Sequence, residues 1–175
     1  MSETGAVTVR PARREDAVGI GRVHVAAWRS AYATILPAAY LAGLSLVRQA
    51  AGYDRAIAAG ACVMVAEAEG RVVGFATAAV TPGAELGEGE IQTLYVQDDW
   101  RDHGAGRALL RAVGLFLAGQ GCATAYLWVL RDNPSRWFYE RLGGRPAARG
   151  TVPVAGQDVP QTAYVWDPIE ALTRE

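Results

Sequence analysis

Apolar residues follow two patterns along this chain: short continuous runs, and runs in which they recur every three or four positions. The first pattern is typical of strands and the second of amphipathic helices. A β-branched run at Ala6–Arg10 predicts a strand, and the spacing from Ile20 to Ala31 predicts a helix. Pro37 interrupts the helical pattern, so we expect a short helical turn there and then a separate helix that ends near Gly60.

The middle of the chain predicts three strands and a helix. Cys62–Ala66 and Val72–Ala78 flank the polar segment Glu69–Arg71, which is the pattern of a β-hairpin. Ile91–Val96 predicts the next strand. After a polar loop, the apolar positions between Leu109 and Leu117 fall on one face and predict an amphipathic helix.

The last third of the chain adds a strand, a helix and two weaker strands. Ala125–Leu130 is a continuous apolar run, and a helix from Asn133 to Leu142 should be stopped by the glycine pair that follows it. The weaker strands lie near Ala147–Val152 and Val159–Trp166. This order of elements predicts a mixed α/β (α+β) fold in one three-layered domain over residues 1–175.

Charge and composition exclude several classes of function. The formal net charge is −1, and the 17 cationic residues are all arginines scattered along the chain, so no basic stripe for nucleic acid is expected. Cys62 and Cys122 lie far apart without histidines at zinc-binding spacing, so we expect no metal site. Met1–Val9 has no apolar run after a basic start, and no segment has the length of a membrane span. We therefore expect a cytoplasmic protein without a membrane partner.

The segment from Arg101 to Arg107 is the strongest candidate for binding a ligand. It joins a strand to an amphipathic helix through Gly104 and Gly106, and a helix N-terminus offers free backbone N–H groups to an anion. The two glycines permit close approach of a diphosphate, and the two arginines add charge-assisted hydrogen bonds. A glycine pair before a helix can also be only a tight turn.

Two sequence blocks together resemble a known family. Arg101-x-x-Gly104-x-Gly106 follows "EIQTLYV", and "DNPSRWFYERLGG" supplies a second block downstream. Both are similar to signature blocks of the GNAT superfamily of acetyl-CoA-dependent N-acetyltransferases, and a looser resemblance covers nearly the whole chain. It implies a mostly antiparallel sheet of about six or seven strands, splayed between strands four and five, with about four flanking helices.

The resemblance also implies how acetyl-CoA, without a metal, would be held. The backbone of Leu94, Tyr95 and Val96 would bind the pantetheine arm as an added strand does. The pyrophosphate would lie on a loop made of Arg101, Asp102, His103, Gly104, Ala105, Gly106 and Arg107.

Three positions depart from the family pattern. The spacing from Asn133 to the aromatic pair is one residue short, so either Asn133 or Asp132 takes the family's asparagine position. Asp102 stands where many members have glycine, and Gly144 replaces an aromatic residue.

Two side chains are candidates for proton transfer. By resemblance Tyr139 would protonate the departing CoA thiolate, although it could instead be a packing tyrosine. Glu90 would act as the base that deprotonates the amine, and the alternative is a solvated carboxylate at a strand end. Alternation along the strand predicts Glu90, Gln92 and Leu94 on one face.

Aromatic residues of the first helix are candidates for the acceptor site. In the family this region walls the acceptor pocket, so Trp28 and Tyr32 would contact the substrate together with Glu90, unless they only pack in the core. We place Trp128 in the core.

Three functions stay open for this chain. It would acetylate a small-molecule primary amine, acetylate a protein or peptide N-terminus, or bind acyl-CoA without catalysis. The oligomeric state is open as well, and a homodimer through the last strands or the loop from Thr81 to Gly89 is one hypothesis.

Overall fold

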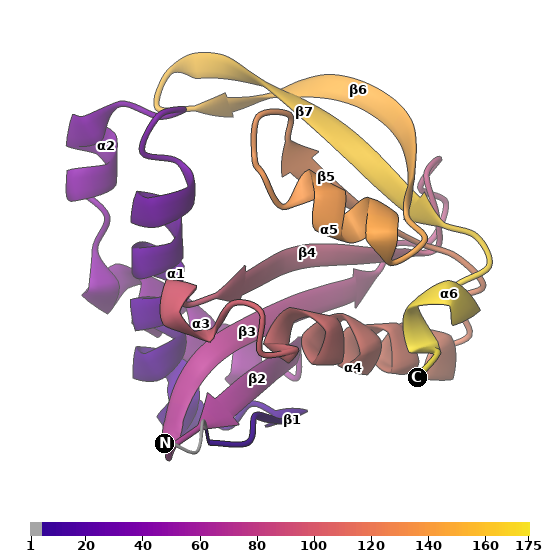
Figure 1. Cartoon of the computed structure of the whole chain (residues 1–175), viewed down its shortest axis with the longest axis horizontal. Helices are drawn as coiled ribbons and strands as arrows, with labels where there is room; N and C mark the ends of the chain where they lie inside the picture. The colour runs from indigo at the N-terminus through magenta and orange to yellow at the C-terminus, as the bar shows by residue number, and fades with distance from the viewer. Residues whose placement is uncertain (1–4) are drawn as a thin grey trace.

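The computed structural model describes residues 5–175, and residues 1–4, the start of the Met1–Val9 segment considered above, lie outside it. Seven strands form one sheet in the order β1-β2-β3-β4-β5-β7-β6 (Figure 1). They are β1 (Thr8–Pro11), β2 (Cys62–Ala68), β3 (Arg71–Val80), β4 (Gly89–Val96), β5 (Ala125–Leu130), β6 (Arg145–Val154) and β7 (Gln157–Trp166). All neighbouring pairs are antiparallel except β4 and β5.

Helices cover both faces of the sheet. They are α1 (Ala17–Ala31), α2 (Ala38–Ala42), α3 (Leu46–Ala58), α4 (Ala105–Gly119), α5 (Arg136–Arg141) and α6 (Glu170–Thr173), with 3-10 turns at Arg14–Asp16 and Asp98–Trp100. Ile20 and Val23 of α1 pack on Val63 and Val65 of β2, while the other face of the sheet carries the larger core with Leu109 of α4. The expected mixed α/β fold with three layers is confirmed.

The last two strands are longer than the sequence predicts. β6 and β7 pair from Arg145↔Val165 to Val154↔Gln157, with ten residues in each strand. Residues of β6 are exposed or only partly buried, so the strand lacks the buried apolar run by which a strand is recognised. The short helix α6 is a further element that hydrophobic spacing did not predict.

The sheet opens between its two central strands. β4 and β5 pair only at Gly89↔Ala125 and Glu90↔Tyr126, and their later residues diverge (Figure 1). From Ile91 onward β4 pairs with β3 alone. One edge of β4 therefore faces the opening with backbone groups that have no strand partner.

A β-bulge at Gln92 changes which side chains share a face of β4. The register with β3 moves from Thr77↔Thr93 to Ala78↔Ile91, which leaves Gln92 as the extra residue. Leu94 packs in the α4-side core, whereas Tyr95 packs against Phe75 on the α1 side. The predicted common face of Glu90, Gln92 and Leu94 is therefore wrong, because a bulge interrupts strict alternation.

At one end of the opening, the segment of α1 and α2 packs against β5 and β7. Tyr32 from the end of α1 and Leu41 of α2 share a buried apolar cluster with Leu130 of β5 and Val159 of β7. Figure 1 shows α1 and α2 beside the tip of the β6–β7 hairpin. The cluster closes one side of the opening between β4 and β5.

Two further findings concern residues 5–175. None of the helices described there combines the length and the apolar character needed to cross a bilayer. The same residues contain no group of three or more His, Cys, Asp or Glu side chains placed to bind a metal ion.

Candidate functional site

A cavity of about 270 Å³ occupies the opening between β4 and β5. α1, β4, β5, β6, β7 and the segment that contains α5 all contribute to its lining. Of the sequence candidates, it brings together Trp28, Tyr32, the 91–95 stretch of β4, Asn133 and Tyr139. Among the described residues that line it, none carries a charged side chain. The cavity is therefore an uncharged chamber beside the unpaired edge of β4.

Tyr139 reaches this chamber from α5. Its side chain is buried, and its ring lies 5.7 Å from Phe138, 6.0 Å from Tyr164 and 6.2 Å from Trp166 between centroids. Burial raises the pKa of the Tyr139 phenol above its ordinary value, and the nearby Tyr32 adds to the effect. The hydroxyl is thus protonated at neutral pH and able to donate.

Two hydrogen bonds fix α5 on β7. The Tyr164 hydroxyl donates to the Glu140 carboxylate over 3.1 Å, and the Trp166 indole N–H donates to the Leu142 carbonyl oxygen over 3.1 Å. The two bonds tie the residues one and three positions after Tyr139 to a strand of the sheet. The position of Tyr139 is therefore set by a regular element and not by a loop.

The structure explains why glycine occupies position 144. A Cβ atom there would lie 2.8 Å from the Trp166 ring and 2.9 Å from the Tyr139 carbonyl oxygen, closer than such atoms pack. Trp166 fills the space into which a larger side chain at 144 would have to fit. The departure from the family pattern at Gly144 thus has a packing cause.

We expect Gly144→Ala to lower the free energy of unfolding by about 1–3 kcal/mol, the usual cost of overpacking. Thermal denaturation followed by circular dichroism measures the effect. Gly52→Ala is the matched control, because Gly52 lies in α3 with no atom within 4 Å of its would-be Cβ. A Gly144→Ala protein as stable as the Gly52→Ala protein would contradict the packing described at Trp166.

Asn133, and not Asp132, faces the chamber. Asn133 is buried, its Nδ2 donates to the Tyr32 hydroxyl over 3.3 Å, and its Oδ1 accepts from the Ser135 backbone N–H over 2.9 Å. Asp132 is exposed and pairs with Arg131 at 3.3 Å. Asn133 therefore links α1 to the start of the segment that carries Tyr139.

Glu90 lies where β4 and β5 separate, beside the chamber and not in its lining. Its side chain is partly buried, and its Oε2 lies 3.5 Å from the Tyr126 hydroxyl, which donates to it. Burial raises the pKa of the Glu90 carboxyl group, and the bond from Tyr126 acts in the opposite direction. Tyr126 is a partner that the apolar strand pattern did not suggest.

The loop before α4 has the features of an anion site. Gly104 has φ of +78°, and its would-be Cβ meets no atom within 4 Å. The first N–H groups of a helix have no intrahelical acceptor, and at α4 no capping side chain accepts from them either. Asp102 has φ of +64°, which accounts for the glycine that many family members carry there. The space beside the Gly104 backbone is thus open.

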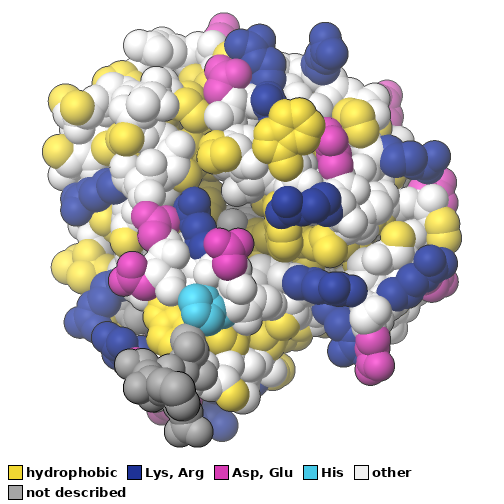
Figure 2. All heavy atoms as spheres, in the orientation of Figure 1, with side chains coloured by type: hydrophobic (Ala, Val, Ile, Leu, Met, Phe, Trp, Pro, Cys, Tyr) yellow, Lys and Arg dark blue, Asp and Glu magenta, His cyan; other side chains and the backbone are white. Residues whose placement is uncertain are grey.

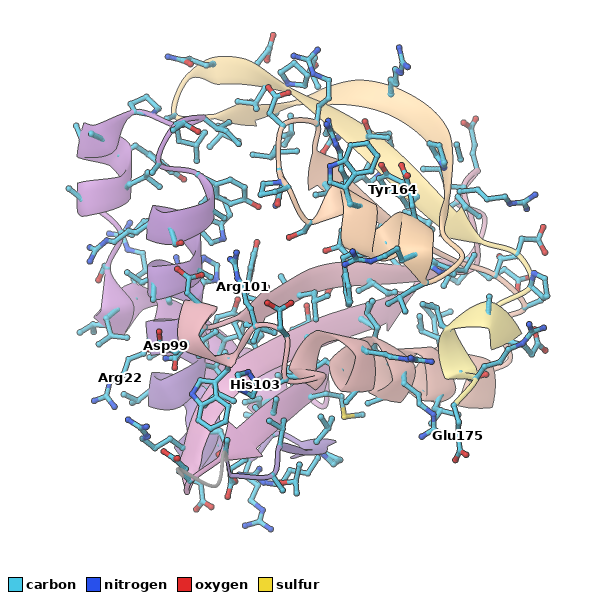
Figure 3. All side chains as sticks on the ribbon, viewed as in Figure 1. Arg22, Asp99, Arg101, His103, Tyr164 and Glu175 are labelled. Carbon is cyan, nitrogen blue, oxygen red and sulfur yellow. The ribbon has the colours of Figure 1, made fainter. Side chains whose placement is uncertain are left out.

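Side chains of the loop differ in what they contact. Arg101 pairs with Asp98 at 3.0 Å, and His103 Nδ1 lies 2.8 Å from the Arg101 carbonyl oxygen. Figure 3 shows Arg101 and His103 on the segment that leads into α4. A Cβ at Gly106 would lie 3.2 Å from the Phe138 ring, so this glycine allows α4 and α5 to approach each other.

Arginine side chains gather over α4 and α5 on the face seen in Figure 2. Arg107, Arg141 and Arg174 line a second hollow of about 300 Å³ between α4, the end of α5 and α6. This hollow lies outside the opening of the sheet. Cationic side chains therefore lie near the loop before α4, while the lining of the chamber is uncharged.

Trp128 was expected in the core, but it is partly exposed and lines the chamber. Alternation along β5 places it on the same face as Tyr126, two residues earlier, and this signal was available in the sequence. Trp28 and Tyr32 line the chamber from α1 and its C-terminal end, with ring centroids 4.9 Å apart. The chamber therefore has aromatic side chains both from the helical layer and from the sheet.

Comparisons with known proteins agree with this geometry. A family model described as an acetyltransferase (GNAT) domain matches residues 59–143. The uncharacterized N-acetyltransferase YuaI of Bacillus subtilis (strain 168) is 33% identical over 168 residues, covering 95% of this chain and 96% of that protein.

Solved structures share the fold. A GCN5-related N-acetyltransferase from Rhodopseudomonas palustris has a TM-score of 0.75 at 20% identity, covering 95% of this chain and 99% of that one. The structure of yncA from Salmonella typhimurium, solved with acetyl-CoA, has a TM-score of 0.69 at 18% identity and covers 97% of this chain and 95% of its own.

Proposed function

This chain belongs to the GNAT superfamily of acetyltransferases, and we propose that it transfers the acetyl group of acetyl-CoA to the primary amine of a small molecule. The observation that carries the proposal is the chamber of about 270 Å³ at the opening of the sheet. It adjoins an unpaired strand edge, a buried tyrosine hydroxyl and a carboxylate whose pKa is raised by burial.

The residues at this opening fit acetyl-CoA. The free edge of β4 at Leu94, Tyr95 and Val96 offers backbone groups to the amides of the pantetheine arm. The open space at Gly104 and the free N–H groups of α4 suit a pyrophosphate. The pyrophosphate would therefore be bound by the loop of Arg101, Asp102, His103, Gly104, Ala105, Gly106 and Arg107. When bound, acetyl-CoA supplies an activated acetyl group as a thioester.

Glu90 and Tyr139 divide the proton transfers between them. The Glu90 carboxylate takes a proton from the ammonium group, directly or through water, and leaves a neutral amine that can attack. The new C–N bond forms as the C–S bond breaks, and the Tyr139 hydroxyl gives its proton to the departing sulfur. The proton released by the acetylated nitrogen then restores the Tyr139 phenol. A backbone N–H near Leu94 would polarise the carbonyl group.

A small acceptor fits the site better than a peptide or a polyamine. The cluster of Tyr32, Leu41, Leu130 and Val159 closes one side, where an extended peptide would need an open groove. A polyamine would favour several carboxylates, but Glu88 is bound through its Oε2 to the Ala123 backbone N–H at 2.6 Å.

Replacing Glu90 by glutamine is expected to remove the acidic limb of the pH profile of kcat/KM. The carboxylate acts as a base only above its pKa, so wild-type activity falls as the pH drops through that raised value. At neutral pH we expect about a fivefold loss, because water can partly replace a base. The measurement is thiol release at saturating acetyl-CoA across pH 5–9.

The stability of the Glu90→Gln protein is the control measurement for this variant. Because the pKa of Glu90 is raised in the folded protein, ionisation of its carboxyl group destabilises the fold. This destabilisation is fully present at pH values above the pKa in the folded state and absent at pH values below the pKa in the unfolded state. Glutamine removes the cost, so the variant should be at least as stable as wild type at neutral pH. An unchanged acidic limb in a folded variant would exclude Glu90 as the base.

The proposed function is tested by thiol release from acetyl-CoA with a panel of small primary amines, an N-terminal peptide and no acceptor. We expect amine-dependent release with at least one small amine. Faster turnover of the peptide would favour the N-terminal acetyltransferase alternative. Tight binding of acetyl-CoA by calorimetry with no turnover would favour a non-catalytic binding module.

A further inference from the structure

Besides Tyr139 of α5, four aromatic side chains line the chamber. Trp28 and Tyr32 come from α1, Tyr95 from β4 and Trp128 from β5. The Trp28 ring lies 4.9 Å from Tyr32 at 79° and 6.5 Å from Tyr95 at 63°, both edge-on arrangements. Such walls favour flat apolar groups and cations that lie over aromatic rings.

The α1 side of this wall is held in place by its neighbours. His24 stacks on Trp28 with centroids 5.5 Å apart and planes within 6°, and its Nδ1 lies 2.8 Å from the Tyr53 hydroxyl. Burial lowers the pKa of His24 to about 4, so the ring is neutral at physiological pH. The wall is thus supported by packing behind it, and His24 adds no positive charge that would repel an ammonium group.

The rest of the acceptor side is apolar or neutral. Leu130, Val152 and Val154 line it, and the polar side chains of the lining, Gln92, Thr93, Asn133 and Gln161, are neutral. A polyamine would bury a second ammonium group here without a charged partner in the lining, at a large cost. Glu90 is the carboxylate placed beside the chamber, at the end where β4 and β5 separate.

From this arrangement we infer that the acceptor is an arylalkylamine, a primary amine on a short chain that ends in an aromatic ring. The ammonium group pairs with Glu90, and the ring lies in the chamber among Trp28, Tyr95 and Trp128. This inference rests on the proposed function, because it names the acceptor class for the same acetyl transfer. The chemistry requires one positive charge at one end and a flat apolar body at the other.

The first test compares kcat/KM for five acceptors with wild-type protein: 2-phenylethylamine, tryptamine, spermidine, glucosamine and an alanine-initiated peptide. We expect the two arylalkylamines to exceed the others by about a hundredfold, the discrimination available to a well-fitted apolar pocket. Turnover that is fastest with spermidine, glucosamine or the peptide would overturn the inference. If spermidine or glucosamine is acetylated fastest, the proposed function is still supported, because both are small amines. Acetyl-CoA binding without turnover of any amine would overturn both.

A second test removes one aromatic wall. Trp128→Ala should raise both the KM and the calorimetric Kd of 2-phenylethylamine, measured with CoA present, by about tenfold, and change those of ethylamine less than twofold. Trp137→Ala is the matched control, because Trp137 is 56% exposed on α5 and does not line the chamber. If Trp128→Ala does not fold, Trp128→Leu serves in its place. Equal effects on both amines, or none, would overturn the inference.

Discussion

Tyr139→Phe is expected to lower kcat by about a hundredfold, which corresponds to about 2.7 kcal/mol of lost transition-state stabilisation. The phenol is buried beside the open edge of β4, and its raised pKa keeps it protonated. Phenylalanine retains the ring contacts with Tyr164 and Trp166 and removes only the proton donor. The affinity for acetyl-CoA should change little, since the hydroxyl acts on the departing sulfur. Steady-state kinetics and calorimetry together measure the two quantities.

Tyr40→Phe is the matched control for this prediction. Tyr40 lies on α2, is partly exposed and does not line the chamber. Its kinetic constants should equal those of the wild type. A folded Tyr139→Phe protein with unchanged kcat would remove Tyr139 from the role of acid and leave it as a packing residue.

Gly104→Val is expected to weaken acetyl-CoA binding by about a hundredfold, or about 2.7 kcal/mol. Two effects act in the same direction. The backbone at Gly104 has φ of +78°, which a β-branched residue adopts only with strain. The valine side chain would also project into the open space that we assign to the pyrophosphate, because no protein atom lies within 4 Å of the would-be Cβ.

Gly60→Val separates these two effects. Gly60 follows α3, has φ of +83° and has the same open surroundings, but it is far from the loop in sequence and is not part of the site. Its variant should show comparable strain and wild-type affinity for acetyl-CoA by calorimetry. Equal affinity in both variants would mean that the pyrophosphate lies elsewhere.

Local patterns were sufficient to predict most of the fold. The helix from Ala17 to Ala31 and the strand from Ala125 to Leu130 appear close to their predicted bounds, because each has a strong apolar period. The opening between β4 and β5 followed from family resemblance and not from periodicity, since divergence of two strands leaves no local pattern. Its place in the structure agrees with that expectation.

Details of the site depend on contacts between distant segments, and no local pattern contains them. The bulge at Gln92 appears only in the register with β3, and it turns Leu94 away from the face expected for it. The Tyr126–Glu90 bond joins residues 36 positions apart. The need for glycine at 144 comes from Trp166, a residue of the last strand. Such contacts decide which side chains meet in the chamber.

Direct transfer to the amine is tested by following the acetyl group itself. Acetyl-CoA labelled in the acetyl group is mixed with the enzyme and 2-phenylethylamine, and the products are separated by mass spectrometry. We expect one labelled acetyl group on the amine nitrogen for each CoA thiol released, with no label on the protein at any time. Thiol release with the label on the protein or in free acetate, and none on any amine, would contradict it.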